Sequence, residues 1–201
     1  MLFVWYKVSF DEKWSHGSAV CETVYFFVEF VCVFPWKCVS LNNQNREKIM
    51  DGILRKLPIG IQTFEKLREG DYLYVDKTAL VWRIASTETP YFLSRPRRFG
   101  KSLLLSTFEA YFEGKKELFE GLAIADMEKE WKTYPVFHLD LNAEKYDSPQ
   151  ALVEILSRQL TQWELKYGKG EDEETLSGRF AGVIRRACEQ SGRGVVVLVD
   201  E

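Results

Sequence analysis

A basic turn that ends in Gly100-Lys101-Ser102 carries the clearest chemistry in this chain. It follows the apolar residues 91–93 and precedes a segment with helical spacing of apolar side chains. A turn that leads into a helix N-terminus directs several backbone N–H groups, and the positive end of the helix dipole, at one point. Gly100 lets the backbone approach a phosphate, Lys101 can reach β- and γ-phosphates, and the Ser102 hydroxyl can bind Mg²⁺. The pattern predicts a phosphate-binding loop.

The residues ahead of this glycine complete the predicted loop. The candidate residues for nucleotide contact are Ser94, Arg95, Pro96, Arg97, Arg98, Phe99, Gly100, Lys101 and Ser102. Arg95 stands where the usual G-x-x-x-x-G-K-[ST] pattern has its first glycine, so the motif departs from that pattern at one position. Arginine side chains beside Gly-Lys-Ser favour phosphate contact, although a solvated basic turn has the same composition.

A second motif, Asp200-Glu201, follows five consecutive apolar residues at 195–199. Such a run is typical of a parallel strand that is buried on both faces. At its carboxyl end, Asp200 would face the Mg²⁺ held by Ser102, and Glu201 would orient or deprotonate a water molecule. Each motif alone has an ordinary structural explanation, but in this order they predict one site for ATP and Mg²⁺. Lys101 and Glu201 are the predicted catalytic residues, and Ser102 and Asp200 the predicted metal ligands.

An α/β fold with a parallel sheet is required to bring these motifs together. Strands are expected at residues 91–95, 136–141 and 195–199, and helices at residues 63–69, from about 76 onwards, 103–112, from about 148 onwards and 176–190. Residues 115–133 are expected to form two short helices packed on the sheet. The predicted loop and Asp200 would then lie at the carboxyl edge of the sheet, where α/β proteins place ligands.

The stretch from Leu57 to Glu201 resembles the predicted AAA-ATPase-like domain family. The resemblance rests on residues 57–62 with 64–65, 72–78, 92–102, 112–114, 119–122, 135–136 with 138–140, and 200–201. In that family the first glycine of the loop is replaced in the same way, so Arg95 agrees with the resemblance. The resemblance implies an ATPase that uses ATP and Mg²⁺.

A three-layer α/β/α P-loop domain with strand order 5-1-4-3-2 is what the resemblance implies for the fold. Strand 4, which separates strands 1 and 3 in that order, is expected beyond Glu201. The strand at 195–199 would therefore have an unpaired edge, and this chain is expected to be poorly soluble alone. Family members usually continue into further ATPase strands and a nuclease-like domain of the PD-(D/E)XK class.

The resemblance also suggests a base site, because related ATPases line the adenine pocket with a comparable aromatic-Val-Asp segment. Here that segment is Tyr74, Val75 and Asp76. An equally good explanation is a plain helix start, with Asp76 or Thr78 as the cap and the aromatic side chain in the core. The same ambiguity applies to two other polar positions. His138 is expected to be a satisfied core or edge histidine, and Asp140 either a cap or an acid near the metal.

Two parts of the chain differ in character. Residues 1–49 are rich in aromatic residues and cysteine, and we interpret them as non-native upstream sequence before a natural start at Met50; residues 50–201 form the ATPase-like part. The apolar segment at 24–36 is too short, and too interrupted by Glu29 and Pro35, for a membrane span. The net charge of −3 argues against binding nucleic acid or membranes by bulk electrostatics. The cysteine spacing predicts no disulfide framework or zinc site, so a cytoplasmic location is expected.

Together these features predict Mg²⁺-dependent ATP hydrolysis. One alternative is a nucleotide-dependent switch or interaction module with little hydrolysis, and another is a phosphotransferase. Glu201 favours hydrolysis, because an acid placed directly after Asp200 suits the activation of water, whereas enzymes that transfer phosphate to an acceptor often use a different arrangement.

Overall fold

The computed structural model describes residues 3–8, for which only the backbone is considered, and residues 55–87, 89–94, 98–141, 148–171 and 173–200. Four of the predicted site residues, Arg95, Pro96, Arg97 and Glu201, lie outside these ranges. Their roles stay predictions.

Four strands form a single sheet in the order β2-β1-β4-β3. The strands are β1 (Phe3–Val8), β2 (Tyr91–Phe92), β3 (Val136–Asp140) and β4 (Val195–Asp200). Strands β3 and β4 are parallel neighbours, at the two positions where the apolar patterns predicted strands. Strand β2 is shorter than expected, and it is separated from β4 by one strand.

Strand β1 corrects one expectation about the sheet. It runs antiparallel to both of its neighbours, and Val4 pairs with Phe92 on one side and with Val199 on the other. The expectation that β4 has an unpaired edge was therefore wrong, because all six of its residues pair with β1. The physical reason is that a buried strand must satisfy its backbone N–H and C=O groups, and an apolar upstream segment can supply the partners.

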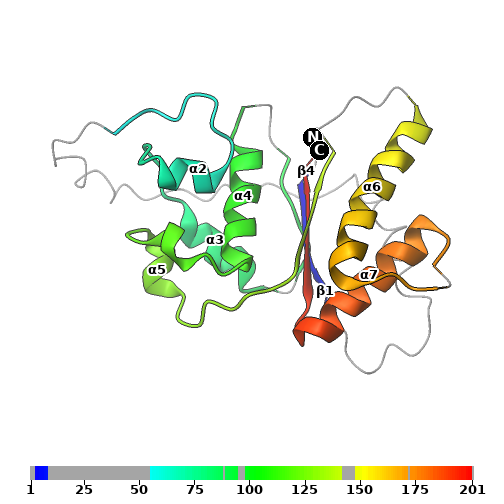
Figure 1. Cartoon of the computed structure of the whole chain (residues 1–201). Helices are drawn as coiled ribbons and strands as arrows, with labels where there is room; N and C mark the ends of the chain where they lie inside the picture. The colour runs from blue at the N-terminus through cyan, green and yellow to red at the C-terminus, as the bar shows by residue number, and fades with distance from the viewer. Residues whose placement is uncertain are drawn as a thin grey trace.

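Helices cover both faces of the sheet (Figure 1). One face carries α4, with smaller helices beside it; the other carries α6 and α7. The bounds on the first face are α2 (Phe64–Glu69), α3 (Thr78–Ala85), α4 (Lys101–Phe112), the 3₁₀ helix η2 (Lys116–Phe119) and α5 (Ala123–Met127). Those on the second are α6 (Pro149–Tyr167) and α7 (Leu176–Ser191).

Strand β4 separates two hydrophobic cores. Val196 and Leu198 belong to the core under α4, whereas Val195, Val197 and Val199 belong to the core under α6 and α7. This alternation follows from the two-residue period of a strand. The same period directs Asp200 to the α4 side, because it follows Leu198 by two residues.

Caps fix the ends of the two helices on the second face. The Ser148 hydroxyl accepts a hydrogen bond from the Ala151 N–H at 3.2 Å, with Pro149 in the first helical turn. Thr175 caps α7 in the same way through the Gly178 N–H at 3.1 Å, and Gly192 ends that helix in a left-handed conformation. These caps account for where both helices begin and for where α7 ends.

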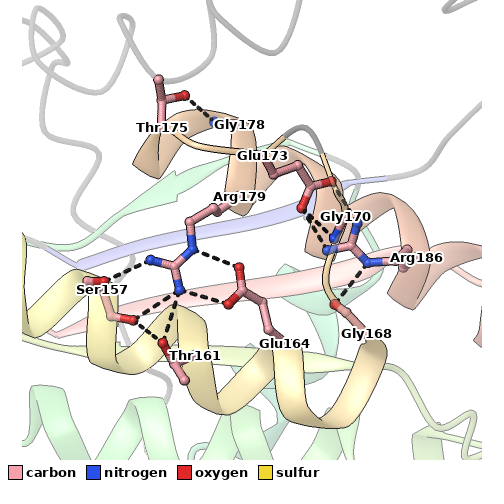
Figure 2. A network of polar contacts seen from close by, with 10 residues as sticks. All are labelled: Ser157, Thr161, Glu164, Gly168, Gly170, Glu173, Thr175, Gly178, Arg179 and Arg186. Atoms are coloured by element: carbon pink, nitrogen blue, oxygen red, sulfur yellow. Dashed lines mark hydrogen bonds and ion pairs between the residues drawn. The ribbon is translucent and has the colours of Figure 1, made fainter.

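Two arginines of α7 join it to α6 and to the loop between them (Figure 2). Arg179 donates to both carboxylate oxygens of Glu164 at 2.7 Å, and also to the Ser157 hydroxyl at 2.7 Å. Arg186 binds Glu173 at 2.6 and 2.9 Å and the Gly168 carbonyl at 3.0 Å. Paired, hydrogen-bonded charges of this kind fix the α6–α7 geometry in a directional way.

No helix in the described ranges combines the length and the apolar character needed to cross a membrane.

Candidate functional site

The turn before α4 has the backbone of a tight loop. Gly100 is its N-cap residue, with φ of 73°, and the Leu104 N–H binds the Gly100 carbonyl at 3.0 Å as the first turn of the helix closes. Arg98, two residues earlier, also has a positive φ, of 66°. A non-glycine residue in this region costs free energy, and such residues are enriched at functional sites. Because Gly100 has no side chain, no side-chain cap occupies the first N–H groups of α4, so these groups could donate to a bound anion.

The loop and Asp200 lie at the same edge of the sheet. Strands β2 and β4 are both antiparallel to β1, so they run in the same direction. The carboxyl end of β2 leads through residues 93–100 into α4, and the carboxyl end of β4 is Asp200. Helix α4 packs against β4 and β3. The topology therefore places the turn that opens α4 and Asp200 at one edge of the sheet, and the joint action of Gly100, Lys101, Ser102 and Asp200 at one site stays a prediction.

Burial separates the members of this site into two groups. The Lys101 side chain is 7% exposed and Asp200 is 7% exposed. Charged side chains are rarely buried to this extent unless a structural or functional demand keeps them there. In contrast, Ser94, Arg98 and Phe99 are exposed on the loop. The buried Lys101 suits a bound anion, and the buried Asp200 suits a bound cation. A ligand that carries both, such as a nucleotide with its metal ion, fits this pair of charges.

The metal-binding capacity of this edge is modest. Nowhere in the described part of the chain do three or more His, Cys, Asp or Glu side chains gather as a metal cluster. The predicted metal ligands at this edge are the Asp200 carboxylate, at the end of β4, and the Ser102 hydroxyl, in the first turn of α4. This set fits Mg²⁺, which is usually held by one or two protein ligands together with substrate phosphates and water. It does not resemble a site that binds a metal ion without a substrate.

Asp140 and His138 extend the same face of the sheet. The Cα positions of Asp140 and Asp200 are paired in the parallel ladder, and the Leu141 N–H binds the Asp200 carbonyl at 2.8 Å. His138 Nδ1 lies 3.0 Å from Oε2 of Glu109, on α4. Burial by itself lowers the pKa of His138, but attraction by Glu109, Asp140 and Asp200 outweighs it and leaves the pKa above its ordinary value. The expectation of a core histidine missed this partner.

Glu109 could have been found from spacing alone. It lies seven residues after Ser102, which places both on one face of α4. The sequence gives no comparable signal for its pairing with β3, because that depends on how the helix is rotated on the sheet.

The predicted base-site residues have structural roles. Tyr74 packs edge-on against Phe64, with ring centroids 5.2 Å apart, and its burial raises the pKa of the phenol. Asp76 accepts hydrogen bonds from the Thr78 N–H at 2.8 Å, from the Thr78 hydroxyl at 2.7 Å and from the Ala123 N–H at 2.7 Å. These contacts agree with the alternative of a helix start with a packed aromatic residue. The base-site role of Tyr74 and Asp76 stays a prediction.

The chain is similar to known proteins over most of its length. The chain is 43% identical over 148 residues to a protein of Azotobacter chroococcum mcd 1 described as an uncharacterized protein in the vnfD 5′ region. That match covers 73% of this chain and 29% of the relative, so the chain spans less than a third of the relative's length. No solved structure matches the chain. The model of the family described as predicted AAA-ATPase matches residues 58–201, from the extended segment before α2 to Asp200-Glu201, and the chain therefore belongs to that family.

Proposed function

We propose that this protein binds ATP with Mg²⁺ and hydrolyses it to ADP and phosphate. The observation that carries the proposal is the position of two buried charges, Lys101 and Asp200, at the edge of the sheet where the Gly100 turn opens α4. A buried cation and a buried carboxylate at a helix N-terminus fit the phosphates and the metal ion of one ligand. Membership of the predicted AAA-ATPase family supports the choice of nucleotide.

Each residue of the loop has a distinct role in this proposal. The N–H groups at the start of α4 bind the phosphates, with Ser94, Pro96 and Phe99 shaping the turn around them. Lys101 binds the β- and γ-phosphates, and Arg95, Arg97 and Arg98 add positive charge at the rim. The Ser102 hydroxyl and Asp200 hold Mg²⁺, which neutralises charge on the β- and γ-oxygens when bound.

Hydrolysis needs one further group, and Glu201 is the proposed one. It follows Asp200 directly and would orient a water molecule for attack on the γ-phosphorus, accepting its proton as the bond to the β-phosphate oxygen breaks. Positioning and charge neutralisation account for the rest of the chemistry, because phosphoryl transfer needs little covalent participation by the protein.

The base of the nucleotide is assigned to the segment around Tyr74 and Asp76. Since these two side chains are used in packing and capping, Val75 between them offers the accessible apolar surface, with a 70% exposed side chain. The base would lie against that surface, while Tyr74 and Asp76 hold the segment in place.

Phosphate release from ATP tests the proposal, measured for the chain, for Lys101→Ala and for Glu201→Gln. We expect release to be lost in Lys101→Ala and to fall by at least about a hundredfold in Glu201→Gln, in which ATP should still bind. Equal rates in all three proteins would refute the ATPase function. Tight binding of ATP without release by any of them would favour the nucleotide-dependent switch.

A further inference from the structure

One polar pair interrupts the apolar layer between α4 and the sheet. His138 of β3 faces α4, because its neighbours Phe137 and Leu139 lie in the core on the opposite side. Its Nδ1 is 3.0 Å from Oε2 of Glu109, and the two side chains are 26% and 33% exposed. The other ring nitrogen, Nε2, is buried and has no hydrogen-bond partner in the described part of the chain. Among the described residues, the polar contact of the His138 ring with its neighbours is therefore the one that Nδ1 makes to Glu109.

On both α4 and β3, this pair lies on the same face of the element as a residue at or next to the predicted metal site, but farther from the carboxyl edge of the sheet. On α4, Glu109 follows Ser102 by seven residues, which is about 10 Å along the same face of the helix. On β3, Asp140 follows His138 by two residues, which is about 7 Å along the same face of the strand. Asp140 is in turn paired with Asp200. The Glu109–His138 contact therefore joins α4 to β3, and from it both elements run towards the edge of the sheet where Ser102 and Asp200 are predicted to bind Mg²⁺.

The contact between Glu109 and His138 differs in kind from those around it. Elsewhere on this interface, Leu105 and Phe108 of α4 belong to one apolar core with Val196 and Leu198 of β4. Apolar packing holds the helix against the sheet but is not directional, so it permits small rotations and shifts. A charge-assisted hydrogen bond has a preferred distance and angle, so it fixes one orientation of the helix.

We propose that His138 and Glu109 are positioning residues for Mg²⁺, and that their contact sets the spacing between Ser102 and Asp200. This inference rests on the proposed nucleotide site. It assigns neither residue a contact with ATP or with the metal ion. Attraction by three carboxylates raises the pKa of His138, which agrees with a ring that binds Glu109 in the folded protein.

Affinity for a non-hydrolysable ATP analogue, measured with Mg²⁺ and again with a chelator, tests the inference. His138→Asn places an amide N–H near the position of Nδ1 and should keep the contact, whereas His138→Gln reaches the position of Nε2 and should lose it. We expect Mg²⁺ to tighten binding in the wild type and in His138→Asn. In His138→Gln, about tenfold of that gain should be lost, with the metal-free affinity changed by less than about twofold.

The outcomes separate this inference from the proposed function. If the wild type shows no Mg²⁺-dependent binding, the proposed function fails and the inference with it. If the wild type shows that gain and His138→Gln keeps it, only the inference is overturned. A parallel loss of metal-free affinity would also overturn it, because a general structural defect would weaken both. Should His138→Gln fail to fold, Glu109→Ala removes the same contact from a more exposed position and carries the same expectation.

Discussion

Replacing Arg179 with methionine should lower the free energy of unfolding by about 3 to 5 kcal/mol, the range for breaking one partner of a buried ion pair. Its guanidinium makes two hydrogen bonds to Glu164 and further ones to Ser157 and Thr161 (Figure 2). The Glu164 side chain is only 6% exposed. Removal of Arg179 therefore leaves a buried carboxylate without the partner that compensates its desolvation.

The size of this effect depends on the unpaired charge, and two further variants check that point. Glu164→Gln keeps an oxygen that accepts from Arg179, so we expect a smaller loss, of about 1 to 2 kcal/mol. Replacing both residues by apolar ones, as Arg179→Met with Glu164→Leu, should recover much of the stability lost in Arg179→Met. Recovery in the double variant identifies the buried charge, and not the lost volume, as the cause.

The loss of stability at acid pH gives an independent test of the Arg179–Glu164 pair. The pKa of Glu164 is below its ordinary value, chiefly because of its hydrogen bonds to Arg179. A lowered carboxyl pKa contributes stability that is complete above the pKa of the unfolded chain and is lost as pH falls through the pKa of the folded state. In Arg179→Met this acid-side loss should become smaller.

Urea unfolding followed by tryptophan fluorescence measures these differences, because Trp163 is partly buried against this core and contacts Phe180 of α7. Arg185→Met is the matched control: Arg185 is on the same helix, its side chain is 56% exposed, and its ion pair with the exposed Glu189 is long, at 4.0 Å. We expect the control to change the free energy of unfolding by less than about 0.5 kcal/mol. A loss in Arg179→Met no greater than in Arg185→Met would refute the reasoning.

Three other predictions test separate parts of the structure. Val4→Pro should lower the urea midpoint much more than Val4→Ala, because proline removes a ladder hydrogen bond from a strand that is paired on both sides. Equal midpoints for the two variants would contradict the placement of β1. His138 has a raised pKa, so its stabilising contribution is complete below the unfolded pKa of about 6.5 and is lost as pH rises through the folded pKa. Unfolding free energies measured across neutral pH should show this step in the wild type but not in His138→Asn. Gly100→Ala should lower the free energy of unfolding by about 1 kcal/mol, because Gly100 has a left-handed φ of 73°. The same variant should weaken MgATP binding, measured by calorimetry, by a larger free energy. Unchanged affinity would exclude a close approach of phosphate to this residue.

Sequence patterns predicted the elements whose signals are local. The apolar run at 195–199 and the capping residues Ser148 and Thr175 each act within a few positions, so β4, α6 and α7 are found close to where they were expected. Strand β1 was not predicted, because residues 1–49 were interpreted as non-native upstream sequence and because the pairing partners of β1 are distant in sequence.

In the candidate site, too, local motifs could be predicted from the sequence, whereas contacts between distant residues could not. Gly100-Lys101-Ser102 and Asp200 are predicted from motifs whose residue types have a known chemical reason, and the structure places the Gly100 turn and Asp200 at one edge of the sheet. The Glu109–His138 contact depends on the rotation of α4 over β3, which no motif specifies. Tyr74 was ambiguous for another reason, since aromatic residues serve both core packing and base stacking, and the edge-on contact with Phe64 reveals the first use.

A double-mutant cycle on MgATP binding tests the central claim most directly. The affinity for a non-hydrolysable ATP analogue would be measured by calorimetry for the wild type, Lys101→Ala, Asp200→Asn and the double variant, with and without Mg²⁺. If both residues act on one bound molecule, Lys101→Ala should weaken binding under both conditions, and Asp200→Asn should weaken it only when Mg²⁺ is present. The two losses should also be non-additive, by about 0.5 to 3 kcal/mol. Unchanged affinity in both single variants, or a loss in Asp200→Asn that does not depend on Mg²⁺, would contradict the account.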